Sequence, residues 1–303
     1  MKSIYAIVAC ALLLAGCSLL DGTERKHLFW KVCDSNSCVY LLGSVHFADS
    51  SFYPLDSAIE NAFELMEELA VEIDLSDDSI SRQIAQMGEQ HGFFHDGRTL
   101  DSVLPGKVAA SLDSLCISWY LPLGTFNRYR PMSAGMTVTS VGIMRLGYDA
   151  KLGIDVHFLE RAHAAGKGIV SLETVEEQVS VLAGDDDSDS LGIFYLETIL
   201  RETSFLDSAT RGMIRAWKTG DDSLFRVYMN LDMAQLSSAD SLLKKEINER
   251  IYYSRNRKMA EKITAFLAED RKIFVVVGAA HLVGNHENIL DILRSRGFTV
   301  EQQ

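Results

Sequence analysis

The 303-residue sequence predicts a single α/β domain with a central mixed β-sheet and a large helical insertion. Short apolar runs typical of buried strands lie near both ends of the chain, at residues 39–42 and 273–277. Most of the intervening residues 80–268 have helical patterns, and no linker divides the chain. Because the strands near both ends must meet in one sheet, we expect the helices between them to form an insertion.

The N-terminus has the pattern of a bacterial lipoprotein signal. A basic Lys2 precedes an apolar run from Ile4 to Leu14, and Ala15-Gly16 places two small residues directly before Cys17. An uncleaved membrane anchor is the alternative, but the apolar run is short for a membrane span of ~20 residues.

Processing at this point would define the mature protein. We expect residues 1–16 to be removed as a signal peptide, and residues 17–303 to form the domain, with a lipid on Cys17. Ser18 favours the outer membrane over inner-membrane retention. The sequence therefore predicts a lipid-anchored protein of the bacterial cell envelope.

The net charge of the chain bears on whether it binds nucleic acid. Lys and Arg number 29 against 42 Asp and Glu, so the formal net charge is −13. An acidic chain without a basic block lacks the positive surface that nucleic-acid binding requires. We therefore expect no nucleic-acid partner.

Cys33 and Cys38 predict a disulfide-closed hairpin. They flank turn-forming residues 34–37, which separate the apolar runs 27–32 and 39–42. In an oxidising compartment such a pair forms a disulfide. Half of a zinc site is the alternative, but no second cysteine pair completes it.

The remaining elements follow from periodicity. Apolar residues at helical spacing predict helices at 55–69, 154–165 and 287–296, and one long helix at 244–267. Short apolar runs predict strands at 69–73, 168–172, 273–277 and 298–300.

Two strands end in the same local pattern, Gly-x-x-His. Gly43 to His46 follows the strand at residues 39–42, and Gly278 to His281 follows the strand at residues 273–277. Each glycine permits a sharp turn and a close backbone approach. Functional groups gather beyond the C-terminal ends of strands in α/β sheets, so this strand quasi-repeat indicates a functional pair of histidines.

Charged residues occur within or beside apolar runs at other positions. Glu72 needs an Arg, a His or a metal ion as partner, because an unpaired buried charge is costly. Glu173 is a second carboxylate at a strand end, and it could equally cap the next helix. Arg255 lies one turn before Met259 on the buried face of its helix.

His91 and His95 are a weaker candidate pair for a metal ion. Their i,i+4 spacing would place them on one helical face, but no third ligand is evident in the sequence. No HExxH, GxSxG, Walker or GxGxxG pattern occurs.

In their order along the chain, these motifs resemble those of the TraB/GumN family, related to PrgY and to the Tiki metalloproteases. The resemblance covers nearly all of the mature chain. The matching segments are Gly43 to His46, Ala70 to Asp74, Gly153-Ile154-Asp155, Leu172-Glu173-Thr174 with Glu177-Gln178, Trp217 with Gly220-Asp221, Arg255-Asn256 and Gly278 to Gly284.

The resemblance implies a metal-dependent hydrolase of the peptidase kind. It implies that His46, His281 and Glu72 bind a divalent ion such as manganese, cobalt or zinc. Glu72 is the general base if it is not a ligand. It further implies that Arg255 stabilises an oxyanion, and that Asn256 orients water or a peptide or protein substrate.

Besides a structural role in the cell envelope or with its polysaccharide, two other functions remain open from the sequence. One is a non-catalytic envelope lipoprotein that binds and sequesters peptides. The other is a metal-free hydrolase that uses His and Glu as acid and base. The sequence does not determine the oligomeric state.

Overall fold

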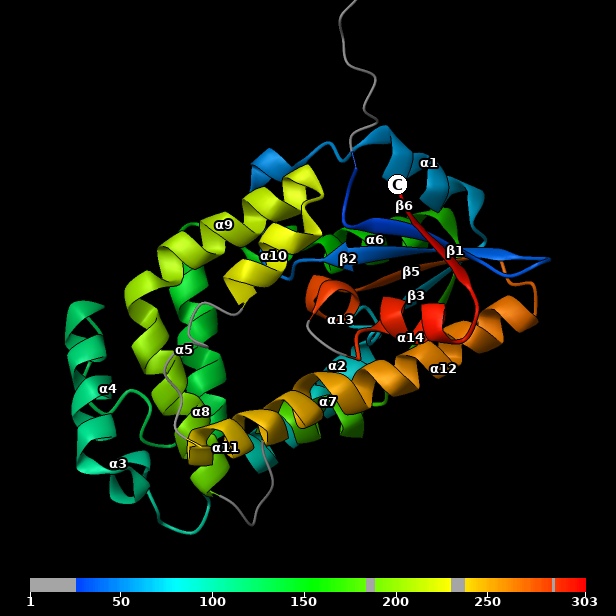
Figure 1. Cartoon of the computed structure of the whole chain (residues 1–303). Coiled ribbons are helices and arrows are strands. Elements are labelled where there is room, and N and C mark those ends of the chain that lie inside the picture. Colours follow the sequence, from blue (N-terminus) through cyan, green and yellow to red (C-terminus); the bar gives the residue numbers. More distant parts are fainter. Residues whose placement is uncertain (1–25, 184–188, 230–237, 285–286) are drawn as a thin grey trace, which may run out of the picture.

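The computed structural model describes residues 26–183, 189–229, 238–284 and 287–303. The expected signal peptide and Cys17 lie outside these residues. A six-stranded mixed sheet forms the centre, in the order β4-β3-β5-β2-β1-β6 (Figure 1). The strands are β1 (Phe29–Cys33), β2 (Cys38–Ser44), β3 (Glu68–Val71), β4 (Gly168–Ser171), β5 (Ile273–Gly278) and β6 (Thr299–Gln302). The predicted α/β fold class is confirmed.

The mixed character of the sheet comes from one strand. β4, β3, β5 and β2 run parallel, whereas β1 is antiparallel to β2 and to β6. β1 and β2 form the predicted hairpin, and the expected disulfide between Cys33 and Cys38 is present. Every residue of the central strand β5 is buried and β3 is nearly so, whereas the edge strand β4 is partly exposed.

Helices cover both faces of the sheet and extend beyond it. α1 and α6 cover one face, and α12, α13 and α14 cover the other (Figure 1). The helices are α1 (Ser57–Leu65), α2 (Asp78–Gly92), α3 (Leu100–Val103), α4 (Gly106–Ser118), α5 (Pro131–Arg145), α6 (Ile154–Ala165), α7 (Val175–Ala183), α8 (Asp189–Glu202), α9 (Leu206–Thr219), α10 (Asp222–Met229), α11 (Ser238–Asn248), α12 (Ser254–Ala268), α13 (Ala279–Val283) and α14 (Ile289–Ser295). None of the described helices is long and apolar enough to cross a bilayer.

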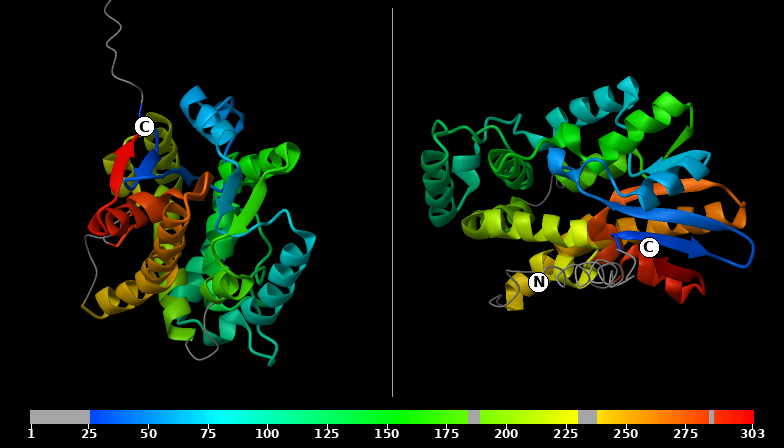
Figure 2. Two further views of the ribbon diagram at one scale, coloured as in Figure 1. Left: turned by 90° about the vertical axis from the view of Figure 1, so that its right-hand side faces the viewer. Right: turned by 90° about the horizontal axis from the view of Figure 1, so that it is seen from above.

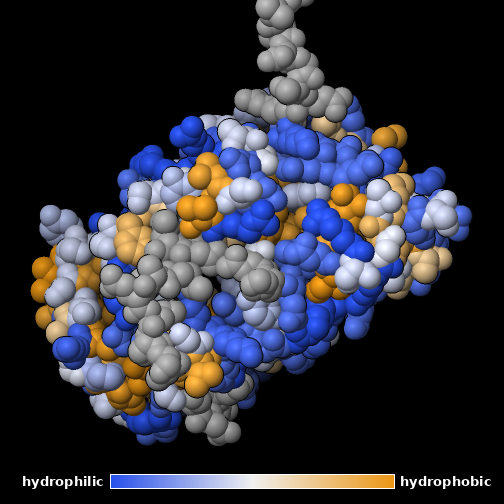
Figure 3. Space-filling view, in the orientation of Figure 1, coloured by the Kyte–Doolittle hydropathy of each residue, from blue (hydrophilic) through white to orange (hydrophobic). Residues whose placement is uncertain are grey.

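The predicted helical insertion has a hydrophobic core of its own. Leu100, Val108, Leu112, Val138 and Leu196 belong to one buried cluster, separate from the core around the sheet. Two further views show these helices extending to one side of the sheet (Figure 2). Figure 3 shows hydrophobic surface at the end of the molecule formed by α3 and α4.

Two predicted helix boundaries were wrong. The helix expected at residues 55–69 ends at Leu65, and β3 takes the residues from Glu68. The single helix expected at residues 244–267 is interrupted by a π-helical turn, η5 (Glu249–Tyr253), between α11 and α12. Apolar periodicity does not reveal one inserted residue in a long helix.

The two Gly-x-x-His segments lie side by side. β2 and β5 are parallel neighbours, with Gly43 opposite Val277 and Ser44 opposite Gly278. An added Cβ on Gly43 would lie 3.0 Å from the Cα of Ala279, so the close approach of the two strand ends requires glycine here. Trp217 fixes the same turn, since its indole Nε1 donates to the Gly43 carbonyl at 2.6 Å.

Gly153 offers a test of this packing. An alanine Cβ at this position would lie 2.6 Å from the His46 carbonyl oxygen. We expect Gly153→Ala to lower the free energy of unfolding by about 1–3 kcal/mol through overpacking. Urea unfolding measures the change. Gly88→Ala is the matched control: a Cβ there meets nothing within 4 Å, and alanine favours the helix by about 1 kcal/mol. Equal effects of the two substitutions would contradict the predicted contact.

Candidate functional site

The candidate site lies where β2, β5 and β3 end. These strands are adjacent and parallel, so their C-terminal ends share one edge of the sheet. His46 follows β2, His281 lies on α13 directly after β5, and Glu72 follows β3. The structure therefore brings together the three residues that the sequence predicted as metal ligands.

Glu72 is buried and paired. Its Oε1 accepts a hydrogen bond of 2.7 Å from the backbone N–H of Gly278, and its Oε2 lies 2.8 Å from Nη2 of Arg255. Burial opposes ionisation of this carboxyl, but His281, Arg255 and His46 together hold its pKa well below the usual value. Glu72 is therefore ionised at neutral pH.

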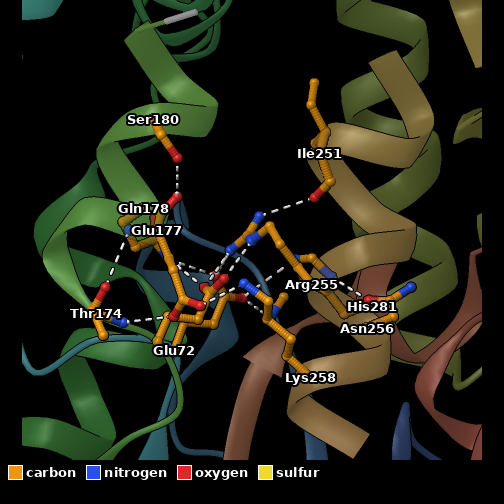
Figure 4. Close-up of polar contacts among 12 residues, drawn as sticks. Glu72, Thr174, Glu177, Gln178, Ser180, Ile251, Arg255, Asn256, Lys258 and His281 are labelled. Atoms are coloured by element: carbon orange, nitrogen blue, oxygen red, sulfur yellow. Dashed lines mark hydrogen bonds and ion pairs between the residues drawn. The ribbon is translucent and has the colours of Figure 1, made fainter. Parts of the chain in front are cut away.

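Arg255 bridges two buried carboxylates. From α12 it donates to Glu72 (Figure 4), and it binds Glu173 through Nε and Nη2, each at 2.6 Å. Its Nη1 donates to the Ile251 carbonyl at 3.1 Å, and Gln178 donates to Glu173 at 2.7 Å. Burial disfavours the cation, but the two carboxylates raise the pKa of Arg255 above its usual value.

The alternative role considered for Glu173, capping the next helix, was wrong. Thr174 and Glu177 cap α7 instead: the Thr174 N–H donates to the Glu177 carboxylate, and the Glu177 N–H donates to the Thr174 hydroxyl. Glu173 is thereby left to bind Arg255.

Asn256 determines the tautomer of His281. Its Nδ2 donates to the Glu287 carbonyl at 2.9 Å, so its Oδ1 must accept from Nδ1 of His281, 2.6 Å away. The Nε2 of His281 then carries a lone pair, and it lies 3.7 Å from Glu72 Oε1. Burial lowers the pKa of His281 to about 4, which keeps the ring neutral.

Asp155 binds Nδ1 of His46, as Asn256 binds Nδ1 of His281. Its Oδ2 lies 2.9 Å from Nδ1 of His46, and its Oδ1 accepts from the Ser44 hydroxyl at 2.7 Å. The charge of Asp155 raises the pKa of His46 to about 9. The side chain of His46 is 61% exposed, so the site opens to solvent at this histidine.

The three predicted ligands converge over Gly278. An added Cβ on Gly278 would lie 3.2 Å from Glu72 Oε1, 3.5 Å from Cδ2 of His281 and 3.6 Å from Nε2 of His46. All three side chains thus lie within van der Waals distance of one point, and glycine leaves that point open.

The donor chemistry of this cluster fits a divalent transition metal. Both histidines bind an acceptor through Nδ1, which leaves Nε2 for a metal, and a carboxylate is the third group. Among the described residues, however, no group of three or more His, Cys, Asp or Glu is already arranged as a metal site. Both oxygens of Glu72 are bonded to protein donors.

The other candidate residues lie elsewhere. α2 ends at Gly92, so His91 and His95 do not share a helical face as the spacing predicted. His95 instead contacts the Glu89 carbonyl through Nε2 at 2.8 Å.

Sequence reasoning did not assign Asp155 or Gln178 to the site. Asp155 is the second residue of α6. The backbone N–H of Ile154 donates to the Val45 carbonyl at 3.0 Å, which places this helix start beside His46. The available signal was the position of Asp155 in a Gly-Ile-Asp segment that opens a helix.

Comparisons with known proteins agree with these motifs. The model of the TraB/PrgY/gumN family matches residues 28–302. The chain is 25% identical to "Metalloprotease TIKI2" of Xenopus tropicalis, over 94% of this chain and 61% of the length of that protein. It is 22% identical to "Metalloprotease TIKI homolog" of Nematostella vectensis, over 93% of this chain and 68% of that one.

A bacterial relative is similar over most of its length. An "Uncharacterized protein" of Treponema pallidum (strain Nichols) is 21% identical, over 92% of this chain and 83% of its own length. No solved structure matches the chain.

The pair of His46 and Asp155 predicts a pH dependence of stability. A histidine whose pKa rises from 6.5 to about 9 on folding stabilises the protein fully below pH 6.5, and this contribution is lost as the pH rises through 9. We expect the urea midpoint of the chelator-treated protein to fall over this window, and Asp155→Asn to flatten the fall.

High salt provides a second check on that pair. Because His46 is largely exposed, ions screen its attraction to Asp155, and 1 M NaCl should weaken the pH dependence. Parallel pH curves for the wild type and Asp155→Asn would contradict the interpretation.

Proposed function

Because the chain belongs to the TraB/PrgY/gumN family, we propose that it is a metal-dependent hydrolase that cleaves peptide bonds. One observation carries the proposal: the imidazoles of His46 and His281 and the ionised carboxylate of Glu72 converge over Gly278. Its similarity to proteins named metalloproteases in Xenopus tropicalis and Nematostella vectensis supports a peptide or protein as the substrate.

His46 and His281 would hold the divalent ion, and Glu72 would be either the third ligand or the general base. A bound manganese, cobalt or zinc ion would polarise the scissile carbonyl and lower the pKa of a water molecule. The low pKa of Glu72 keeps it ionised, as either role requires.

Neighbouring side chains would keep these groups in place. Arg255 and the Gly278 N–H fix the carboxylate of Glu72. Asn256 and Asp155 bind Nδ1 of the two histidines, which leaves the Nε2 of each ring for a metal ion. These contacts support positioning roles for Arg255 and Asn256 beside the direct roles that the family resemblance implies.

The chain is further proposed to be a lipoprotein of the bacterial outer membrane. The support is the sequence from Leu14 to Cys17, with small residues before the cysteine. Removal of residues 1–16 and lipidation of Cys17 would tether the hydrolase in the envelope.

Metal-free hydrolysis is the second candidate function. It is favoured by the ion pair of His46 with Asp155 and by the ionised Glu72, which together offer an acid and a base without a metal. It predicts activity that survives chelation. A non-catalytic peptide-binding lipoprotein would instead bind peptides without turnover.

Metal stoichiometry tests the main proposal. We expect the detergent-solubilised full chain, equilibrated with manganese, cobalt or zinc, to bind about one ion per chain. The double substitution His46→Ala/His281→Ala should abolish binding while the fold is retained. Elemental analysis after desalting measures the bound metal, and circular dichroism monitors the fold.

Two further variants sharpen this test. His91→Ala/His95→Ala removes the same number of histidines outside the site and should leave binding unchanged. Gly278→Ala keeps every proposed ligand but places a methyl group 3.2 Å from Glu72 Oε1, so it should weaken binding. Absence of specific metal from the folded wild type would eliminate the metal mechanism.

Lipidation has its own test. We expect Cys17→Ser to shift the protein from the membrane fraction to the soluble fraction and to abolish incorporation of radiolabelled palmitate. Substitution of the other signal cysteine, Cys10→Ser, is the matched control and should change neither. Persistence of the label in Cys17→Ser would refute the assignment.

A further inference from the structure

Tyr252 lies in the π-helical turn η5 (Glu249–Tyr253), directly before the Arg255-Asn256 pair. The turn is closed by the N–H of Ser254, which donates to the Glu249 carbonyl five residues earlier. One inserted residue rotates the next helical residues by about 100° relative to a continuous α-helix. Such turns recur at functional sites.

The ring of Tyr252 packs against His281. The ring centroids are 5.7 Å apart, and the planes meet at 60° in an edge-to-face arrangement. Tyr252 is half-buried. It therefore borders the site at the buried His281 and not at the exposed His46.

The hydroxyl of Tyr252 lies within the electrostatic influence of the site. Burial raises its pKa, Arg255 lowers it, and Glu202 and Glu72 raise it further, with a net increase. A tyrosine hydroxyl carries its proton at physiological pH even without such a shift, so Tyr252 is a hydrogen-bond donor.

The Tyr252 hydroxyl also has no hydrogen-bond partner among the described residues. By contrast, Arg255 makes four hydrogen bonds within the protein, and the side chains of Asn256 and Gln178 are each bonded twice.

We propose that Tyr252 is a further catalytic residue, which donates its hydroxyl hydrogen bond to the oxygen of the scissile carbonyl as negative charge develops there. The inference rests on the proposed function. It moves the oxyanion role from Arg255, which instead positions Glu72, to Tyr252. No proton is transferred in this step, because the phenol donates only a hydrogen bond.

The substitution Tyr252→Phe removes the donor and keeps the ring against His281. Tyr253→Phe, in the same turn, is the matched control. The manganese-loaded full chain is tested in detergent with a mixture of fluorogenic peptides for kcat and KM, and with a phosphinic peptide whose oxygens mimic the oxyanion. Manganese affinity is measured by calorimetry.

We expect Tyr252→Phe to lower kcat about 10²-fold, as the loss of one oxyanion donor does, with KM nearly unchanged. Affinity for the phosphinic peptide should fall with kcat, whereas manganese affinity should not change. Tyr253→Phe should match the wild type in all three measurements.

The result that overturns this inference alone is a Tyr252→Phe variant with wild-type kcat and phosphinic-peptide affinity. A parallel loss of manganese affinity would also overturn it, because Tyr252 would then act on the ligands. Failure of the wild type itself to bind manganese, cobalt or zinc and to cleave peptide would overturn the proposed function and this inference with it.

Discussion

The ionised carboxylate of Glu72, buried where β3 ends, is the constraint on which the site depends. An isolated charge in this position would be very costly, so the fold must supply partners. Arg255 supplies the positive charge from α12, and Gly278 supplies a backbone donor from the end of β5. Glu173, which follows β4, supplies a second carboxylate that binds Nε and Nη2 of the same guanidinium. One carboxylate thus ties together three strands and a helix.

The two Gly-x-x-His segments are alike in backbone and unlike in surroundings. His281 is buried, neutral and held by an amide, whereas His46 is largely exposed and held by a carboxylate. Their pKa values accordingly move in opposite directions, to about 4 and about 9. The same Gly-x-x-His turn therefore places two chemically distinct imidazoles in one site. The site is open to solvent at His46.

The helical insertion meets the site at the π-helical turn. Ile247 and Ile251, on either side of its start, pack with Met132 and Phe194 of the insertion. Arg255 follows on α12, whose apolar face covers the sheet, and it donates back to the Ile251 carbonyl. The turn thus changes the helix from packing against the insertion to packing against the sheet, and it places Tyr252 beside His281 as it does so.

The sequence by itself determined the strands, the hairpin and its disulfide, both Gly-x-x-His turns and the need of Glu72 for a partner. These features depend on neighbouring residues, and local periodicity and turn chemistry report them. Only the tertiary structure decided that Arg255, 183 positions away, is that partner, and that Asp155, 109 positions from His46, orients it. It also decided the tautomer of His281 and the π-helical turn, because both depend on how distant side chains pack together and not on any local pattern.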